Sequence, residues 1–263
     1  MIAQIYVDNI VFGGMSDTMV KHFVGQMQTE FEMSMVGELT YFLGLQTKQM
    51  EDSTFMSQSK YAKNIVKKFG MDNASHKRTP APTHQKLSKD EGGISVDQSL
   101  YRSMIGSLLY LTASRPDITF AVGVCARYQA EPKASHLNQV KRILKYVNRT
   151  SDYGILYTNG SDPVLTGYCD ADWAGSVDDR KSTSGGCFFL GSNLISCAIN
   201  ISKSPIQNSR TKHIDIRHHF IRELVEDKVI CLEHINSELQ LADIFTKALE
   251  ATQFENLRSC IYV

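Results

Sequence analysis

The stretch from residue 167 to residue 186, GYCDADWAGSVDDRKSTSGG, limits the possible fold more than any other segment. It places carboxylates, turn residues and the single tryptophan between two apolar runs. Residues 163–166 read as the start of a strand, and 187–190 and 194–196 read as a hairpin with its turn at 191–193. Asp170 is therefore expected on or just beyond a strand that continues into an antiparallel meander.

The pattern around Asp170 leaves two interpretations open. A buried carboxylate is unfavourable unless it is paired or binds a metal ion, which favours a ligand. Aspartate is also a common loop residue, so an isolated DAD sequence is typical of turn or surface acids. We expect Asp172, Asp178 and Asp179 to be acids of this second kind.

The composition is that of an ordinary globular chain. Of the 263 residues, 42% are hydrophobic and 21% are charged, and no apolar run approaches the length that spans a bilayer. The 28 basic and 28 acidic residues cancel, which argues against a protein that coats nucleic acid over its whole surface. The six cysteines form no CxxC pair, so neither a zinc module nor a disulfide framework is supported.

No membrane segment, secretory signal or small-molecule cofactor motif is visible in the sequence. We therefore expect an intracellular protein, cytoplasmic or nuclear, without a signal peptide. Residues 1–7 resemble the inside of a strand, and we expect a truncated start.

The first seventy residues predict short strands and two helices. Residues 4–14 read as two β-rich arms around a turn at Asp8 and Asn9. A helix follows, with Asp17 as its N-cap, and residues 33–50 fit two short strands. A second helix opens at 57–60 and ends at Gly70, and its lysines point away from its apolar face: Lys60, Lys63, Lys67 and Lys68.

Residues 73–93 are rich in proline, serine, glycine and charge, which predicts an exposed connector. Apolar positions at helical spacing then predict three successive helices, within 101–112, 121–128 and 135–147. The Arg115-Pro116-Asp117 sequence ends the first of these helices and caps the second. The outer faces of this helical unit are basic, either as a solvated surface or as a binding face: Arg127, Lys133, Lys141, Arg142, Lys145 and Arg149.

The last part of the chain predicts a helix at 209–228, a strand at 229–235 and a helix at 238–249. With the preceding strands this is an α+β or α/β arrangement. The first of these helices carries His213, Asp215, His218, His219 and Glu223. Asp215, His219 and Glu223 share one face, a spacing that suits a metal ion, although a structural or substrate-side role is the simpler alternative.

Eight strings along the chain resemble, in the same order, the Pol polyprotein of copia-type LTR retrotransposons: IYVDNIVFGG, YFLGLQ, SQSKYAKNIVKKFGM, YRSMIGSLLYLTASRPDITFAVGVCARY, HLNQVKRILKYVNRTSDYGILY, GYCDADWAGSVDDRKSTSGG, SRTKHIDIRHHFIRE and QLADIFTKAL. The resemblance implies a reverse-transcriptase palm remnant at 1–56, a thumb and helical connection at 57–163, and an RNase H-like mixed-sheet domain at 164–263.

In that family the first string reads YVDD, and its two aspartates join an earlier one to hold two Mg²⁺ ions. Phosphoryl transfer needs hard oxygen ligands on ions about 3.5–4 Å apart. Asp8 matches the first of these aspartates, but Asn9 replaces the second and supplies no negative charge. We therefore expect no polymerase activity from this chain.

The resemblance also implies a second two-metal site, of the RNase H type, held by four carboxylates. Asp170 matches the first and Asp243 matches the last. The family's middle pair lies on a helix and a strand that are missing here, because residues 194–197 run almost directly into 198–205. This internal deletion predicts a loose or exposed sheet and doubtful Mg²⁺ binding.

The leading hypothesis is a Pol fragment, related to RNA-directed DNA polymerase and RNase H but catalytically inactive by itself. An alternative is a non-enzymatic remnant that holds an RNA–DNA hybrid or duplex by its backbone. Its phosphate contacts would be Lys60, Lys63, Lys67, Lys68, Lys141, Arg142 and Lys145. A third hypothesis is a residual RNase H that uses Asp170 and Asp243 with carboxylates from a partner chain.

Overall fold

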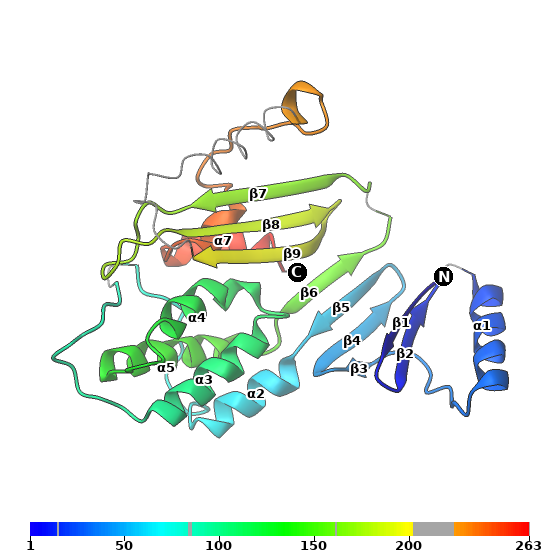
Figure 1. Ribbon diagram of the computed structural model, residues 1–263, viewed down its shortest axis with the longest axis horizontal. Helices are drawn as coiled ribbons and strands as arrows, with labels where there is room; N and C mark the ends of the chain where they lie inside the picture. Colours follow the sequence, from blue (N-terminus) through cyan, green and yellow to red (C-terminus); the bar gives the residue numbers. More distant parts are fainter. Residues whose placement is uncertain (15, 84–85, 161, 202–223, 263) are drawn as a thin grey trace. The chain divides into compact units, whose positions relative to one another are not determined.

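The computed structural model describes residues 1–14, 16–83, 86–160, 162–201 and 224–262, and the chain divides into two compact units, Met1–Leu43 and Gly44–Val263. Figure 1 shows the elements of each unit. The strand pairs β1–β2, β4–β5, β5–β6, β7–β8 and β8–β9 are all antiparallel. With the helices described below, this confirms an α+β fold.

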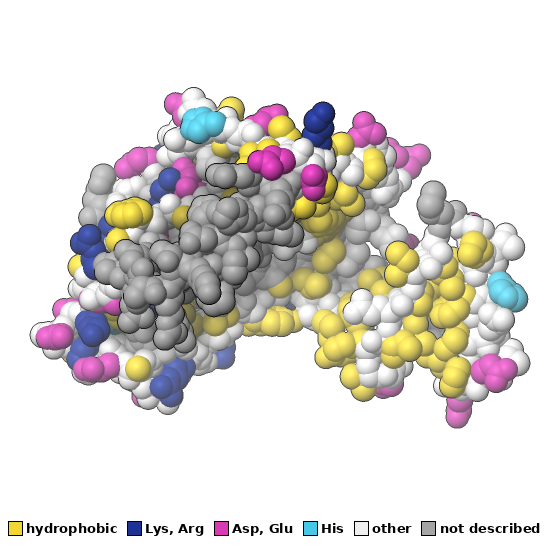
Figure 2. Space-filling view, turned by 45° about the horizontal axis from the view of Figure 1, so that its top comes forward, with side chains coloured by type: hydrophobic (Ala, Val, Ile, Leu, Met, Phe, Trp, Pro, Cys, Tyr) yellow, Lys and Arg dark blue, Asp and Glu magenta, His cyan; other side chains and the backbone are white. Residues whose placement is uncertain are grey.

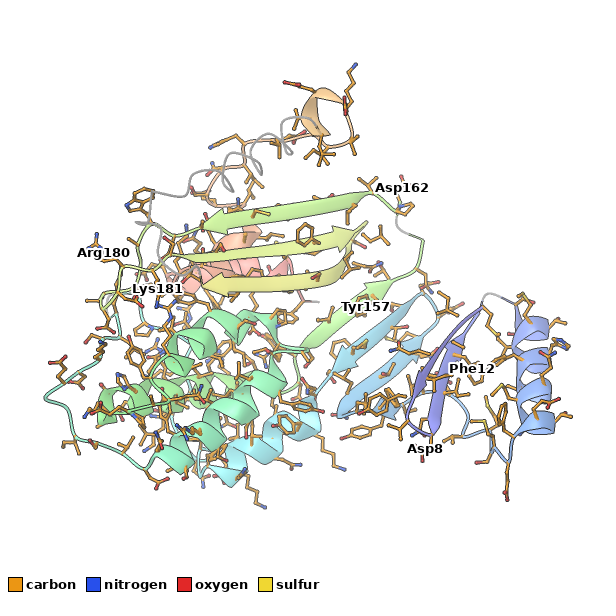
Figure 3. The ribbon with its side chains drawn as sticks, in the orientation of Figure 1. Asp8, Phe12, Tyr157, Asp162, Arg180 and Lys181 are labelled. Atoms are coloured by element: carbon orange, nitrogen blue, oxygen red, sulfur yellow. The ribbon has the colours of Figure 1, made fainter. Side chains whose placement is uncertain are left out.

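The first unit is built on the predicted hairpin. Strand β1 (Ile2–Tyr6) pairs with β2 (Asn9–Gly13), and Tyr6 lies opposite Asn9. The two-residue turn is therefore Val7 and Asp8, one position before the predicted turn, and Val7 takes a positive φ of 54°. Figure 3 shows Asp8 at the end of this hairpin.

The first unit also contains helix α1 (Asp17–Glu30) and the short strand β3 (Tyr41–Phe42). The N-cap of α1 is Ser16 and not Asp17, because the Ser16 hydroxyl accepts a hydrogen bond from the Met19 amide at 3.5 Å. Many hydrophobic side chains of this unit are exposed (Figure 2), including Ile2, Ile5, Val7 and Val36.

The second unit begins with strands β4 (Leu45–Met50) and β5 (Ser53–Ser57), followed by α2 (Ser59–Lys68). Helix α2 buries Ala62, Ile65 and Val66 as its spacing predicts, and the chain leaves it at Gly70 with φ +65°. Strand β6 (Gly154–Thr158), absent from the sequence prediction, pairs with β5. Glycine is required at 154, since a Cβ there would lie 2.2 Å from the Met56 carbonyl oxygen.

Three helices form the core of the second unit, as predicted: α3 (Gln98–Leu111), α4 (Thr119–Ala126) and α5 (Ala134–Arg149). Helix α4 contacts both α3 and α5, and α5 also contacts α2. In α3 and α5 the buried positions recur at helical spacing, so amphipathic periodicity accounts for their packing. Helix α4, with the sequence TFAVGVCA, is apolar on nearly every side. The short 3-10 helix η1 (Pro116–Ile118) joins α3 to α4.

A buried polar network ties η1 to α5 and to the end of the chain. Arg115 donates from Nε and Nη2 to Asp117 at 3.0 and 2.9 Å, and from Nη1 to the Thr150 carbonyl at 2.6 Å. The Asp117 carboxylate also accepts from the hydroxyls of Tyr146 and Tyr262. The side chains of Arg115 and Asp117 are 1% and 0% exposed, so the ion pair lies inside the core.

The connector at 73–93 has no regular helix or strand among its described residues, and the expectation of an exposed segment holds only in part. Thr79 and Pro80 are buried. Arg142 donates to the Thr79 carbonyl at 3.2 Å, and Gln139 donates to the Pro80 carbonyl at 2.9 Å. The segment satisfies its backbone through side chains of α5, which lets it lie against the helices.

A three-stranded meander follows, in the order β7-β8-β9: β7 (Leu165–Ala171), β8 (Thr183–Leu190) and β9 (Asn193–Ile201). The predicted hairpin is confirmed, and its turn is Gly191 and Ser192. Within the described residues β7 pairs only with β8, and Leu165 is 65% exposed. Most residues of β7 are exposed, and Asp170 is half-buried.

The secondary structure of residues 224–262 differs from the helices and strand that the sequence predicts there. Residues 229–235 form no strand, because no neighbouring strand pairs with them among the described residues, and Val229 and Leu232 are exposed. The predicted helix at 238–249 is only the 3-10 helix η3 (Leu241–Phe245), and the last helix is α7 (Ala251–Ser259). The predicted helix at 209–228 lies mostly outside the described residues; 224–226 are helical.

In the described part of the chain, no helix combines the length and the apolar character that crossing a membrane requires.

Candidate active site, a carboxylate pair with a lysine

The structure brings together the two family-matched acids of the second unit. Asp170 lies near the end of β7, and Asp243 lies in η3. Helix η3 contacts β7, β8, α4 and α7, so a segment near the end of the chain returns to the first strand of the meander. The side chain of Asp243 is 3% exposed and that of Asp170 is 24% exposed.

Two residues that follow Asp243 complete the cluster. The Lys247 ammonium lies 2.9 Å from Oδ1 of Asp243 and 3.7 Å from Oδ2 of Asp170. The Thr246 hydroxyl donates to Oδ2 of Asp170, which lies 76 positions earlier in the chain. One turn thus supplies an ammonium and a hydroxyl to a carboxylate on another element.

The electrostatics of Asp243 follow from this crowding. Burial raises the pKa of its carboxyl, the Lys247 ammonium lowers it, and the nearby Asp170 carboxylate raises it again, so that the net shift is upward. The pKa of Lys247 is also raised. Burial alone would lower it, but the carboxylates of Asp243 and Asp170 outweigh burial.

The packing of η3 on the sheet fixes this geometry. A Cβ at Gly185, in β8, would lie 2.6 Å from the Phe245 Cβ and 3.1 Å from the Thr246 Cγ2. Phe245 is fully buried there. The absence of a side chain at Gly185 therefore lets η3 approach the strand next to β7 and bring Asp243 to Asp170.

The third family-matched acid, Asp8, belongs to the first unit. It lies in an exposed hairpin turn, and its Oδ1 accepts a hydrogen bond from Asn9 Nδ2 at 2.9 Å. The hairpin thus presents one carboxylate and one amide.

The predicted nucleic-acid contacts differ in exposure. Lys60, Lys63, Lys67 and Lys68 are all exposed on α2, where Lys63 pairs with Asp152 at 2.6 Å. On α5, Lys141, Arg142 and Lys145 are half-buried. Arg142 is committed to Thr79, donating to its Oγ1 at 2.9 Å, and burial lowers the pKa of its guanidinium.

The other basic residues of the helical unit are largely paired. Lys133 is buried and lies 2.7 Å from Glu131, and Arg127 donates to the Thr183 hydroxyl at 3.0 Å. These positions support a mainly structural interpretation of that face.

The acids of the 172–179 loop are loop residues, as expected. Asp172 accepts from the Thr183 amide, Asp179 pairs with Lys181, and Asp178 accepts from the Tyr128 hydroxyl at 3.0 Å. They cap and anchor the loop between β7 and β8.

The histidine-rich string with His213, Asp215, His218, His219 and Glu223 lies outside the described residues. Within the ranges that the structure does describe, no group of three or more His, Cys, Asp or Glu side chains could hold a metal ion.

Sequence reasoning missed the roles of Thr246 and Lys247. The i,i+4 spacing of Asp243 and Lys247 was available as a signal, since such residues meet on one helical face. The contact with Asp170 depends on how η3 packs against the sheet, which spacing does not reveal.

A family model described as reverse transcriptase (RNA-dependent DNA polymerase) matches residues 1–83. The chain is 30% identical to a retrovirus-related Pol polyprotein from transposon RE2 of Arabidopsis thaliana, over 96% of the chain and 21% of that protein. It is 31% identical to the Pol polyprotein from transposon TNT 1-94 of Nicotiana tabacum, over 97% of the chain and 24% of that protein. The chain thus spans less than a quarter of the length of these relatives.

A shorter relative, an uncharacterised mitochondrial protein of Arabidopsis thaliana, is 37% identical over 74% of the chain and 81% of its own length. No solved structure matches the chain. The reverse-transcriptase match at the start and the identity to Pol polyproteins along nearly the whole length show that this chain belongs to the Pol polyprotein family of copia-type retrotransposons.

Proposed function

We propose that this chain is a Pol-derived fragment whose residues 164–263 are related to RNase H, and that by itself it neither polymerises DNA nor cleaves the RNA of an RNA–DNA hybrid. The observation that carries the proposal is the composition of the Asp170 cluster. Two carboxylates meet there, and the third charged group in contact with them is the Lys247 ammonium.

Two further observations support the RNase H relationship and the deletion. The acid on the first strand of an antiparallel meander meets an acid from a segment near the end of the chain. In addition, the alignment with the RE2 polyprotein is 305 positions long although the chain has 263 residues, so at least 42 positions are gaps in this chain. Such gaps support a loss of sequence within the matched region.

The cluster does not fit the pair of Mg²⁺ ions that the family chemistry implies. Two-metal hydrolysis needs two ions about 3.5–4 Å apart, and carboxylate oxygens must hold both of them. Mg²⁺ also demands near-octahedral oxygen coordination, and an ammonium 2.9 Å from one of the two carboxylates opposes a second cation. The polymerase motif is similarly incomplete, because Asn9 adds no charge beside Asp8.

A cleavage assay tests the proposal. RNA labelled at one end is annealed to DNA and incubated with excess protein in Mg²⁺ and, separately, in Mn²⁺, with an active RNase H as positive control. We expect no cleavage above the level of the Asp170→Asn variant, which reports any contaminating nuclease. Cleavage by the wild-type chain that Asp170→Asn abolishes would contradict the proposal.

A second candidate function is non-enzymatic binding of a nucleic-acid backbone. The exposed lysines of α2 favour it, since Lys60, Lys63 and Lys67 recur at i, i+3 and i+7 and therefore share one helical face. Such binding would depend on phosphate neutralisation and would weaken steeply with salt.

The matching experiment is a titration of a labelled hybrid at low and physiological ionic strength. We expect the Lys60→Ala, Lys67→Ala double variant to bind more weakly and to show a salt slope smaller by about two. Lys228→Ala, an exposed lysine elsewhere in the same unit, is the control and should leave the slope nearly unchanged. No binding at low salt would exclude this candidate.

A further inference from the structure

The Asp170 cluster has the arrangement of two acid ligands around one cation, and the cation is a side chain. Oδ1 of Asp243 and Oδ2 of Asp170 both face the Lys247 ammonium, at 2.9 and 3.7 Å. The Thr246 hydroxyl donates to the same Oδ2 of Asp170. The carboxylates are 3% and 24% exposed, whereas the lysine side chain is 45% exposed and reaches the pair from the solvent side.

Two neighbouring carboxylates repel each other, and the repulsion is stronger where burial removes water. The pair therefore needs a proton or a cation to persist. Lys247 supplies that cation from the same turn as Asp243, four residues further on. Because it is tethered, it competes at a high effective concentration against any ion in solution.

No other described cation is available to the pair in the same way. Arg127, which directly follows α4, donates to the Thr183 hydroxyl at 3.0 Å. Lys181, in the loop after β7, pairs with Asp179. In the described part of the chain, Lys247 is thus the one basic residue that forms an ion pair with both Asp170 and Asp243.

We propose that Lys247 is the built-in counter-ion of the Asp170–Asp243 pair: it holds β7 to η3 without a divalent ion, and a divalent ion must displace it to reach the carboxylates. The inference rests on the proposed function only in taking these two acids as the family-matched ligand positions. It also names a cause for the poor fit between this cluster and the family's Mg²⁺ ions: the Lys247 ammonium, which a single substitution can remove.

The test compares thermal unfolding of the wild-type chain, Lys247→Met and Lys247→Arg in EDTA and in Mg²⁺ or Mn²⁺, at ionic strength matched with NaCl. For the wild type and Lys247→Arg we expect the divalent ion to shift Tm by less than about 1 °C. Lys247→Met should unfold at a lower temperature in EDTA and regain about 2 °C or more when the ion is added.

Mn²⁺ binding, measured from the free-ion spectrum by electron paramagnetic resonance, gives a second readout. Lys247→Met should bind Mn²⁺ at least about tenfold more tightly than the wild type, because a unit positive charge has been removed next to the ligands. When Asp170→Asn is added to the Lys247→Met variant, the gain in Mn²⁺ affinity should disappear.

The inference is overturned if Mg²⁺ or Mn²⁺ raises the wild-type Tm and Asp170→Asn removes that effect, or if Lys247→Met binds Mn²⁺ no better than the wild type. Should Lys247→Met fail to fold, the wild-type measurements and Lys247→Gln decide. Neither readout measures RNA cleavage, so a failure here is distinct from a failure of the proposed function.

Discussion

At the scale of single residues, Arg115 and Asp117 form a fully buried ion pair. Both side chains are buried, and the guanidinium and carboxylate are bonded to each other and to Thr150, Tyr146 and Tyr262. Burying two charges is unfavourable unless the geometry is good and the remaining hydrogen-bonding groups are satisfied. Here the partners are present, so removing one leaves an uncompensated charge in the core.

Asp117→Asn should therefore lower the free energy of unfolding by about 3–5 kcal/mol. Urea unfolding followed by circular dichroism measures it. The matched control is Asp152→Asn, which breaks the exposed Lys63–Asp152 pair and should change stability by no more than about 1 kcal/mol. Equal losses in the two variants would show that burial of the Arg115 pair is not the source of its effect.

The same carboxyl predicts a pH dependence. Burial raises the pKa of Asp117, but Arg115 and the hydroxyls of Tyr146 and Tyr262 outweigh burial and hold it below the ordinary value of 3.8. A carboxyl whose pKa is lower in the folded state stabilises the protein above its unfolded pKa, and this contribution is lost as pH falls through the folded pKa.

The stability difference between the wild type and Asp117→Asn should therefore stay constant from pH 7 to about pH 5 and narrow below about pH 4. Urea titrations at each pH measure this difference. A difference that grows as the pH is lowered would contradict the sign of the shift.

At the scale of elements, the position of η3 decides whether a site exists at all. Its residues approach β8 at Gly185, where any Cβ would meet Phe245 and Thr246. The neighbouring atoms are a buried Cβ and a short side chain, so they cannot move aside without shifting η3. A change at one glycine should therefore disturb the acid pair without touching either acid.

Gly185→Ala should destabilise the chain by about 1–3 kcal/mol, as overpacking does in a filled interior. Gly123→Ala is the matched control, because Gly123 lies in α4 and a Cβ there would meet nothing within 4 Å. The control should stabilise the helix by roughly 0.5–1 kcal/mol. The two substitutions, compared by urea unfolding, should have opposite signs, and loss of stability in both would contradict this account of Gly185.

Local pattern predicted the helices better than the strands. The apolar spacing of α3 and α5 corresponds largely to their buried faces, because a helix forms its hydrogen bonds within its own segment. A strand needs a partner. Residues 229–235 open with an apolar run typical of a strand yet form none, whereas β6 was missed although β5 pairs with it.

At the scale of the whole second unit, contacts between distant segments define the fold. Strand β5 pairs with β6 although the helices lie between them in the sequence. Arg78 binds Glu255, 177 positions away, and the Tyr262 hydroxyl donates to Asp117. The candidate site has the same origin. The sequence predicted a strand at Asp170, and the resemblance matched Asp243 to a family acid. The contacts of Lys247 with these two acids depend on how η3 packs against the sheet, and no local sequence pattern predicts that packing.

The most direct measurement of this arrangement is a double-mutant cycle with Asp170→Asn and Lys247→Met, because these residues come from separate segments and meet only if η3 returns to β7. The free energy of unfolding is measured for the wild type, both single variants and the double variant. The structure predicts a coupling energy of about 0.5 kcal/mol or more, as for other residues in contact. Additivity within about 0.3 kcal/mol would mean that the two side chains do not interact, and would contradict the account.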